Sequence, residues 1–367
     1  MRKIPTVRLW QAFLCHPYCM MTRRELMTMT TYTIPRHEQI LDCLLAGAMG
    51  DSLGADIEFA NLAQIRARLP EGFSDLPIHQ GVPGAITDDT QMTLFTAEGL
   101  VRAAVRGTLK GICHPPGVIH HALLRWLVTQ AEMPLTEVDD IGLVADRRLN
   151  ARRAPGLTCL DALRQARTFG ALAVNGSKGC GTIMRVAPIA FVAEDRVRGL
   201  AMECSALTHG HPTGQEAAAA WALILRSLAD GDELEQAAAS HAHSFGAETR
   251  DAILRGLQTP ADSRPETTEQ LGGGWIAEEA LSIAIHACRC ARDLEHGLAV
   301  AVTHSGDSDS TGAIAGNALG LMFPGQARSH RWAAQVECQD LIERLAADLA
   351  LAISGQMDDL VTRYPGA

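Results

Sequence analysis

The stretch ILDCLLAGAM, at residues 40–49, decides the fold class of this chain. Its apolar residues recur every three or four positions, which places them on one face of a helix. Alanine is abundant in the rest of the chain, and alternating runs of Val, Ile or Thr are nearly absent. We therefore predict one large all-α domain over residues 37–367. Comparable helical patterns cover roughly residues 91–106, 117–131, 159–172, 197–208, 214–229, 277–290, 293–303 and 330–353.

Length and charge narrow the classes of function. The chain has 367 residues, 47% of them hydrophobic, which is enough to bury a large core. Its net charge of −10, from 32 basic and 42 acidic residues, argues against sequence-independent nucleic-acid binding. No run of about 18 apolar residues occurs, so we expect no membrane span. The 10 cysteines form no CxxC pair and no zinc-binding spacing, which favours a reducing cytoplasm over a disulfide framework.

The first 36 residues differ from the rest of the chain. They contain six basic residues, one acidic residue and an apolar patch that includes Trp10 and Phe13. One interpretation is a poorly ordered tail or a wrongly assigned start. The other is a basic arm whose aromatic side chains bind an acidic partner.

Two adjacent carboxylates, Asp88 and Asp89, follow Thr87 at the start of a predicted helix. One acid or hydroxyl would suffice to cap the N-terminus of that helix. A second adjacent carboxylate adds charge repulsion unless a cation offsets it. The segment is therefore either a helix cap or part of a cation site.

A second cluster, GDSDSTG at 306–312, again combines carboxylates with hydroxyls. Asp307 and Asp309 offer the oxygen ligands that suit Mg²⁺ or Mn²⁺ better than zinc. An EF-hand loop is excluded, because its twelfth position would be Ala318, where a bidentate Glu is required. The cluster is a candidate site for a hard cation.

Two further segments combine small residues with functional candidates. Glycine recurs at every fourth position from 312 to 320, as expected for a helix face packed closely on a neighbour. The segment GAMGDSLGADIE at 47–58 mixes small residues with acids near the end of the first helix. There, Asp51 is a candidate cap. Glu58 is either a carboxylate that transfers a proton or gates a site, or a solvated residue.

The segment NGSKGCGTIMR at 175–185 is rich in glycine. Gly176, Gly179 and Gly181 precede a helical run and could present backbone N–H groups to a phosphate. The segment lacks the spacing of a P-loop and the strand context of a dinucleotide-binding unit, so phosphate binding is only one interpretation. Nearby, His209 is either a further ligand contact or a structural hydrogen-bonding residue.

Taken in order, these motifs resemble the ADP-ribosylglycohydrolase family, which includes the dinitrogenase-reductase-activating glycohydrolases. The resemblance spans about 260 residues, and its strength lies in five modest motifs that occur in the family's order. It implies an all-α fold with a central cleft that holds two Mg²⁺ ions, with Mn²⁺ as an alternative. The matching segments are residues 47–58, 87–92, 177–185, 208–209 and 306–312.

The resemblance implies a metal site with two sides, bridged by Asp309. The family often has Thr where this chain has Ser310, so whether Ser310 or Thr311 reaches a metal stays open. The ligands that the resemblance implies are Thr87, Asp88 and Asp89 on one side and Asp307, Asp309 and Ser310 on the other.

The resemblance also implies a substrate site. His209 matches a substrate-contacting histidine, and Glu58 matches the carboxylate near the scissile bond, whose loop gates the site. The residues that match the loop around the diphosphate and ribose of ADP-ribose are Gly176, Ser177, Gly179 and Gly181. The expected catalytic residues, for a reaction that passes through an oxocarbenium-like transition state, are Glu58, Asp88, Asp89 and Asp309.

The function that follows is Mg²⁺-dependent removal of ADP-ribose from modified protein side chains, with arginine favoured over serine and other carriers. A further hypothesis is that the protein is an antidote to an ADP-ribosyltransferase toxin, which segment 1–36 would bind. The alternatives are a non-hydrolytic protein that neutralises such a transferase through this segment, and a two-metal phosphoesterase. We expect an ADP-ribosylated protein as partner and no nucleic acid or membrane.

Overall fold

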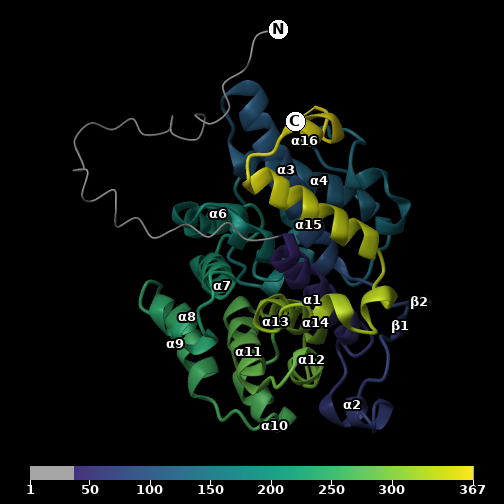
Figure 1. Ribbon diagram of the computed structural model, residues 1–367, viewed down its shortest axis with the longest axis vertical. Helices are drawn as coiled ribbons and strands as arrows, with labels where there is room; N and C mark the ends of the chain where they lie inside the picture. Colours follow the sequence, from purple (N-terminus) through teal and green to yellow (C-terminus); the bar gives the residue numbers. More distant parts are fainter. Residues whose placement is uncertain (1–36, 367) are drawn as a thin grey trace. The chain divides into compact units, whose positions relative to one another are not determined.

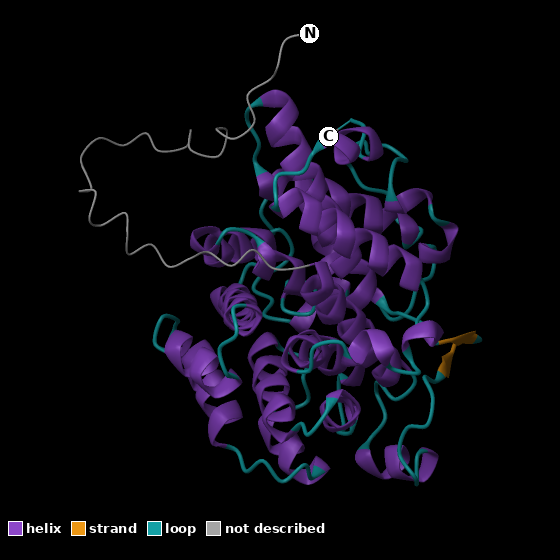
Figure 2. Ribbon diagram, viewed as in Figure 1, coloured by secondary structure: helices purple, strands orange, loops and turns teal. Residues whose placement is uncertain are grey.

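The computed structural model describes residues 37–366, and helices account for almost all of their regular structure (Figure 2). In this part of the chain the only strands are β1 (Ile78–His79) and β2 (Val82–Pro83), which form a short antiparallel ladder. The predicted all-α class is thus confirmed. The N-terminal segment 1–36, expected to be a tail or a partner-binding arm, lies outside the described residues.

The described residues form α-helices, which Figure 1 labels in order along the chain, and short 3₁₀ turns lie between a few of them. The α-helices are α1 (His37–Ala55), α2 (Leu62–Arg68), α3 (Asp88–Lys110), α4 (Pro115–Thr129), α5 (Leu157–Gln165), α6 (Glu194–Ala206), α7 (Pro212–Ala229), α8 (Leu234–Ala242), α9 (Ala247–Gln258), α10 (Pro265–Thr268), α11 (Ala277–Cys290), α12 (Leu294–Val302), α13 (Ser308–Met322), α14 (Gln326–Ser329), α15 (Gln339–Ile353) and α16 (Asp358–Arg363). The 3₁₀ turns are η2 (Leu143–Ala145), η3 (Arg147–Leu149), η4 (Cys180–Thr182), η5 (Ala187–Phe191), η6 (Glu269–Leu271) and η7 (Ala333–Gln335).

Helices α1 and α13 are enclosed by other helices. Every residue of α1 from Ile40 to Ala55 is buried, and so is every residue of α13 from Ser308 to Leu321. A helix that is buried all round must pack on several neighbours, and α1 contacts α3, α12, α13, α14 and α15. None of the helices within residues 37–366 is both long and apolar enough to cross a bilayer.

The two enclosed helices lie side by side with their backbones in direct contact (Figure 1). A Cβ atom added to Gly50 would lie less than 3.0 Å from backbone atoms of Gly312, and the reverse is also true. Gly316 and Gly320 meet the backbone of α1 in the same way. The close packing predicted for this glycine face is therefore confirmed, and it fixes the N-terminal end of α13 beside the C-terminal end of α1.

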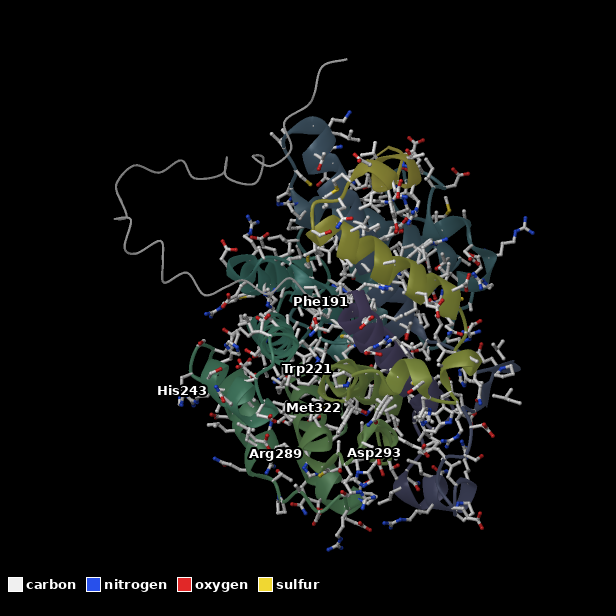
Figure 3. The ribbon with its side chains drawn as sticks, viewed as in Figure 1. Phe191, Trp221, His243, Arg289, Asp293 and Met322 are labelled. Carbon is white, nitrogen blue, oxygen red and sulfur yellow. The ribbon has the colours of Figure 1, made fainter. Side chains whose placement is uncertain are left out.

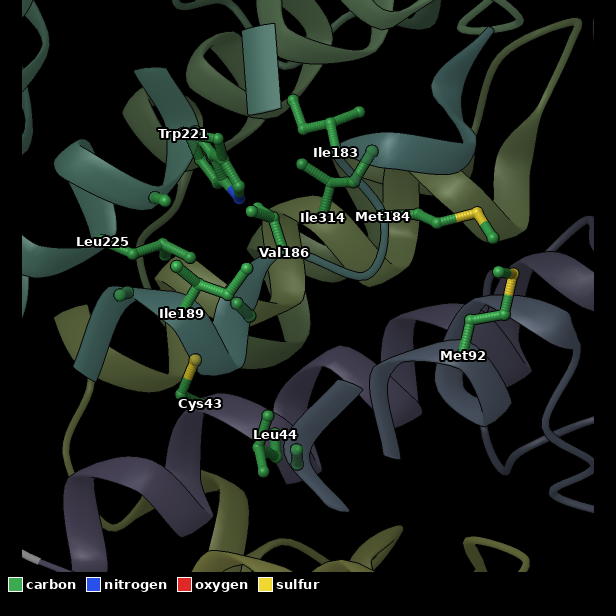
Figure 4. Packing of buried hydrophobic residues seen from close by; sticks show 14 of the residues in the cluster. Cys43, Leu44, Met92, Ile183, Met184, Val186, Ile189, Trp221, Leu225 and Ile314 are labelled. Atoms are coloured by element: carbon green, nitrogen blue, oxygen red, sulfur yellow. The ribbon is translucent and has the colours of Figure 1, made fainter. Parts of the chain in front are cut away.

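The hydrophobic core extends from this helix pair into the surrounding helices. Figure 4 shows side chains from α1, α3, α7, η5 and α13 meeting in one cluster. Phe191 of η5 and Trp221 of α7 are fully buried and lie among the ribbons in Figure 3, whereas the exposed His243 lies at the periphery. Segments that are distant in sequence thus share a single continuous core.

Two predicted helices are shorter than expected. The helix predicted over 159–172 is α5, which already ends at Gln165. The pattern predicted a helix over 330–353, but α15 begins only at Gln339, after Cys338 with φ +60°. The preceding residues instead fasten the loop that contains β1 and β2. The side chain of Gln335 accepts a hydrogen bond from the N–H of Leu76, and the N–H of Glu337 donates to the carbonyl of Gly84. These tertiary contacts override the helical periodicity in this stretch.

We predict that Gly316→Ala lowers the free energy of unfolding by about 1–3 kcal/mol, because the new methyl group overlaps the α1 backbone and forces the two helices apart. Urea denaturation measures the change. The matched control is Gly199→Ala in α6, where a Cβ atom meets nothing within 4 Å. There, the better helix propensity of alanine should stabilise the protein by up to about 1 kcal/mol. Equal effects of the two substitutions would contradict the backbone contact.

Candidate active site

A group of carboxylates lies where the end of α1 meets the beginnings of α3 and α13. Burial raises the pKa of all six, which indicates a crowded site of low polarity. For each of the other five, the charge of Asp309 is the second cause of the increase. Asp309 therefore lies at the electrostatic centre of the group. The six residues, which we call the acidic cluster, are Asp51, Glu58, Asp88, Asp89, Asp307 and Asp309.

Asp51 attaches the beginning of α3 to α1. Its carboxylate accepts hydrogen bonds from the N–H and hydroxyl of Thr87, at 3.0 and 2.7 Å, and from the N–H and hydroxyl of Thr90, at 3.1 and 2.5 Å. Asp51 is thus a cap, as the sequence suggested, but it caps α3 from the interior of a different helix. Thr87 is the N-cap residue of α3, so these bonds fix the backbone that carries Asp88 and Asp89.

On the opposite side, Glu58, Asp307 and Asp309 form a group of potential metal ligands. One carboxylate oxygen of each lies within 4.8 Å of the others. Asp307 is the N-cap residue of α13 and Asp309 belongs to its first turn. Both are buried, whereas Glu58 remains partly exposed. Glu58 is therefore the member of this group that solvent or a substrate can reach most easily.

The arrangement of the remaining oxygens fits a hard divalent cation. Oδ1 of Asp89 is buried and has no hydrogen-bond partner, which is costly unless a ligand completes its environment. The hydroxyl of Thr311 donates toward backbone carbonyls and lies 2.9 Å from Nε2 of His304. Ser310 has no such backbone bond, and its Oγ lies near the acidic cluster, 3.6 Å from Sγ of Cys180. Carboxylates with a hydroxyl are ligands typical of Mg²⁺ or Mn²⁺.

The glycine-rich loop lies against His209. A Cβ atom on Gly179 would lie 3.2 Å from Nε2 of His209, and one on Gly181 would lie 2.7 Å from Sγ of Cys159. Burial and the charge of Arg185 lower the pKa of His209 to about 3, so its ring is neutral. The neutral His209 ring therefore packs against the loop and contributes polar atoms but no charge.

Two contacts connect this loop to the acidic cluster. The first runs through residues 156–158: the N–H of Gly156 donates a hydrogen bond to Oδ2 of Asp88, and the hydroxyl of Thr158 lies 3.0 Å from the hydroxyl of Ser177 in the loop. Sγ of Cys180 lies 2.9 Å from Oδ2 of Asp307. Gly176, by contrast, has open space where a side chain would be. The structure thus brings the predicted metal-binding residues together and places the loop beside them.

Sequence reasoning missed three side chains at this site. Burial and the charge of Asp307 raise the pKa of the Cys180 thiol well above its ordinary value, so it is protonated beside that carboxylate. Phe59 and Trp275 stack with ring centroids 5.2 Å apart, and both are substantially exposed. The only sequence feature that could have indicated a role for this pair is that Phe59 directly follows Glu58. The carbonyl of Trp275 accepts a hydrogen bond from the N–H of Cys180, and this tertiary contact holds Trp275 beside the loop.

The structure thus combines an all-helical fold with a buried acidic cluster beside a glycine-rich loop. The family model described as ADP-ribosylglycohydrolase matches residues 33–359. The chain belongs to the ADP-ribosylglycohydrolase family. This family is metal-dependent and acts on ADP-ribosylated substrates, so membership supports ADP-ribosylglycohydrolase activity here.

Individual relatives are distant but align along most of their length. The ADP-ribosyl-[dinitrogen reductase] glycohydrolase of Rhodospirillum rubrum is 24% identical over 330 residues, which cover 87% of this chain and 97% of that protein. An uncharacterised protein of Archaeoglobus fulgidus is 25% identical over 322 residues, covering 85% and 96%. A solved ADP-ribosylglycohydrolase-related protein complex superimposes with a TM-score of 0.63 at 24% identity, covering 87% of this chain and 99% of the other. This last similarity supports the fold.

We predict that the chelator-treated protein loses stability as the pH rises. The folded state raises the pKa of Asp51 from 3.8 to about 7 and that of Glu58 from 4.5 to about 10. Above about pH 4 the folded protein therefore binds more protons than the unfolded chain. The stability that these protons provide is lost progressively as the pH rises toward the folded-state pKa values of the two groups. The thermal midpoint should be several degrees lower at about pH 8 than at about pH 5.

Added Mg²⁺ or Mn²⁺ should raise the midpoint more at the higher pH, because protons compete with the cation at the lower pH. The comparison variant is Asp309→Asn, which removes the charge common to the cluster and should flatten the pH dependence. If the thermal midpoint of this variant fell with pH as steeply as that of the wild-type protein, the proposed coupling between Asp309 and the other carboxylates would be contradicted.

Proposed function

We propose that this protein is a hydrolase that uses two divalent cations, Mg²⁺ or Mn²⁺, to release ADP-ribose from modified arginine side chains. The observation that carries the proposal is the convergence of three segments, the end of α1 and the first turns of α3 and α13, around Asp309. The glycine-rich loop beside this cluster is a suitable place for the diphosphate and ribose. An acidic metal site next to a loop that can bind phosphates suits hydrolysis of an ADP-ribosyl bond.

The chemistry of the residues supports a division of roles. Bound divalent cations supply positive charge that orients ribose hydroxyls and lowers the pKa of water. We assign the cations to Thr87, Asp88 and Asp89 on one side and to Asp307, Asp309 and Ser310 on the other. The hydrogen bonds of Thr311 to backbone carbonyls favour Ser310 as the hydroxyl ligand.

The proton of the attacking water goes to a carboxylate of the cluster, for which Asp88, Asp89 and Glu58 are the candidates. Glu58 is favoured because it is the partly exposed one, whereas Asp88 already accepts a hydrogen bond from Gly156. Bound cations would lower the raised pKa of Glu58, so that its carboxylate would be charged and able to accept the proton. The carboxylates also stabilise the positive charge that develops on ribose as the glycosidic bond breaks. The neutral His209 and the loop residues Gly176, Ser177, Gly179 and Gly181 hold the rest of ADP-ribose in place.

The stacked aromatic pair supports arginine as the modified residue. Phe59 is 68% exposed and Trp275 is 42% exposed, and both belong to segments that contact the cluster. A guanidinium group is planar and cationic, so it gains from an aromatic face and from nearby carboxylates. A serine linkage has neither a plane nor a charge to match this surface.

The alternatives make different demands on the site. A non-hydrolytic binding protein would not need the complete set of carboxylates that the cluster retains. A role as antidote to an ADP-ribosyltransferase toxin rests on segment 1–36, which lies outside the described residues, so this role stays a prediction. A phosphoesterase would use the same metals but would cleave a phosphate ester, which product analysis distinguishes.

We predict that Asp309→Ala lowers the rate of ADP-ribose release by at least about 100-fold, because it removes the central carboxylate of the site. Release is measured with an ADP-ribosyl-arginine peptide, Mg²⁺ and chromatographic detection of free ADP-ribose, and again with chelator. The matched control is Asp359→Ala, an exposed acid of α16, which should retain full activity. A well-folded Asp309→Ala protein with normal turnover would remove the proposed mechanism.

We also predict that Trp275→Ala lowers kcat/KM for ADP-ribosyl-arginine peptides about two- to fivefold, the amount expected for loss of an exposed cation–π contact. Turnover of an ADP-ribosyl-serine peptide, if measurable, should not change. Trp275→Phe retains an aromatic face and should keep most of the preference. An equal loss with both peptides would argue against guanidinium recognition by this pair.

A further inference from the structure

Lys178 is the one charged residue of the glycine-rich loop between Gly176 and Gly181. A lysine in a loop that binds phosphates commonly contacts the phosphate itself, as a point charge. Here its Nζ instead donates hydrogen bonds to the carboxylates of Glu278 and Glu248, the latter at 3.0 Å. These hydrogen bonds raise the pKa of Lys178, so its ammonium group stays charged. The positive charge of the loop is therefore engaged by the protein.

The two carboxylates belong to two helices that lie side by side (Figure 1). Glu278 lies in the first turn of α11, and Glu248 lies in the first turn of α9. Glu248 also accepts a hydrogen bond, at 2.8 Å, from the hydroxyl of Thr213 in α7. Lys178 thus fastens the loop to the beginnings of two helices outside the acidic cluster.

The partner carboxylate of Glu278 is enclosed by the protein. The Glu278 side chain is only 8% exposed, and its Oε2 is buried without a hydrogen-bond partner. Within residues 37–366, Lys178 is the one cation that forms an ion pair with Glu278. A buried carboxylate that loses its counter-charge is strongly unfavourable. The ion pair therefore resists any movement of the loop away from α11.

Backbone contacts continue from this ion pair along the loop. The N–H of Ala277 donates to the carbonyl of Lys178, at 2.8 Å, and the N–H of Cys180 donates to the carbonyl of Trp275, at 3.2 Å. An isolated antiparallel β-bridge lies between these two hydrogen bonds. A shift at the ion pair would thus be passed directly to the main chain of the loop, where we place the diphosphate.

We propose that Lys178 is a positioning residue, whose ion pair with Glu278 holds the glycine-rich loop in the shape that receives the diphosphate of ADP-ribose. The inference rests on the proposed function and concerns the substrate side of that site. Lys178 does not contact the phosphates, whose charge is left to backbone N–H groups and bound cations. Loss of the ion pair should therefore weaken substrate binding and leave the chemical step at the acidic cluster intact.

The first test is Lys178→Met, which removes the ammonium group and keeps an unbranched side chain. The KM for an ADP-ribosyl-arginine peptide should rise about three- to tenfold, with kcat changed less than about twofold. The Kd of free ADP-ribose with Mg²⁺, measured by calorimetry, should rise by a similar factor. Lys178→Arg keeps the charge and should restore most of the binding. The matched control is Lys110→Met, an exposed lysine at the end of α3, which should behave as wild type.

The second test separates positioning from direct phosphate binding. Glu278→Gln keeps the shape of the side chain, removes its charge and frees Lys178. If the ion pair positions the loop, this variant should also raise KM, and the double variant should be no worse than Lys178→Met alone. Weaker binding in Lys178→Met with unchanged or tighter binding in Glu278→Gln would overturn the inference, because Lys178 would then contact the phosphate.

Two further outcomes separate this inference from the proposed function. Unchanged KM in both variants, or a loss confined to kcat, would overturn the positioning role and leave the proposed hydrolase standing. A wild-type protein that neither binds ADP-ribose nor releases it from the peptide would overturn both.

Discussion

The contact between the backbones of α1 and α13 is the constraint on which the rest of the structure depends. Glycines on both helices allow the axes to approach until main-chain atoms touch. Such an approach has little tolerance for sliding or rotation, because interiors are close-packed. Asp51 near the end of α1 and Asp309 near the beginning of α13 are therefore held in fixed relation. The helix contact that completes the core therefore also positions the carboxylates of the acidic cluster.

The site divides its carboxylates into two kinds. Asp51 is fully buried, and four hydrogen bonds from Thr87 and Thr90 offset only part of the cost of burying its charge, so its main role is to hold α3 on α1. Asp89 keeps an unpartnered oxygen, and the charge of Asp309 raises the pKa of its neighbours. These groups carry an electrostatic cost that bound protons or a bound cation would offset. Positive charge bound at the acidic cluster would therefore stabilise the folded protein.

The sequence allowed prediction of the fold class and of the segments that converge on the candidate site, because helical periodicity and clustered oxygen donors are local patterns. It did not reveal how distant segments pair. Nothing in the spacing of residues around Asp51 indicates that it caps a helix that begins after Thr87. The stack of Phe59 on Trp275 likewise depends on tertiary contacts. The length of α15 was misjudged for the same reason, because Gln335 is engaged by a remote loop.

The pairing of Asp51 with the first turn of α3, and of α1 with α13, also sets an order of events during synthesis. The ribosome releases α1 and α3 early, whereas α13 follows only after nine further α-helices have been made. Until then α1 has no glycine partner, and the carboxylates of α3 lack Asp307 and Asp309 on the other side of the acidic cluster. A nascent chain that stops before Asp307 lacks two of the six carboxylates of the acidic cluster. The complete acidic cluster therefore forms late, when the polypeptide is nearly finished.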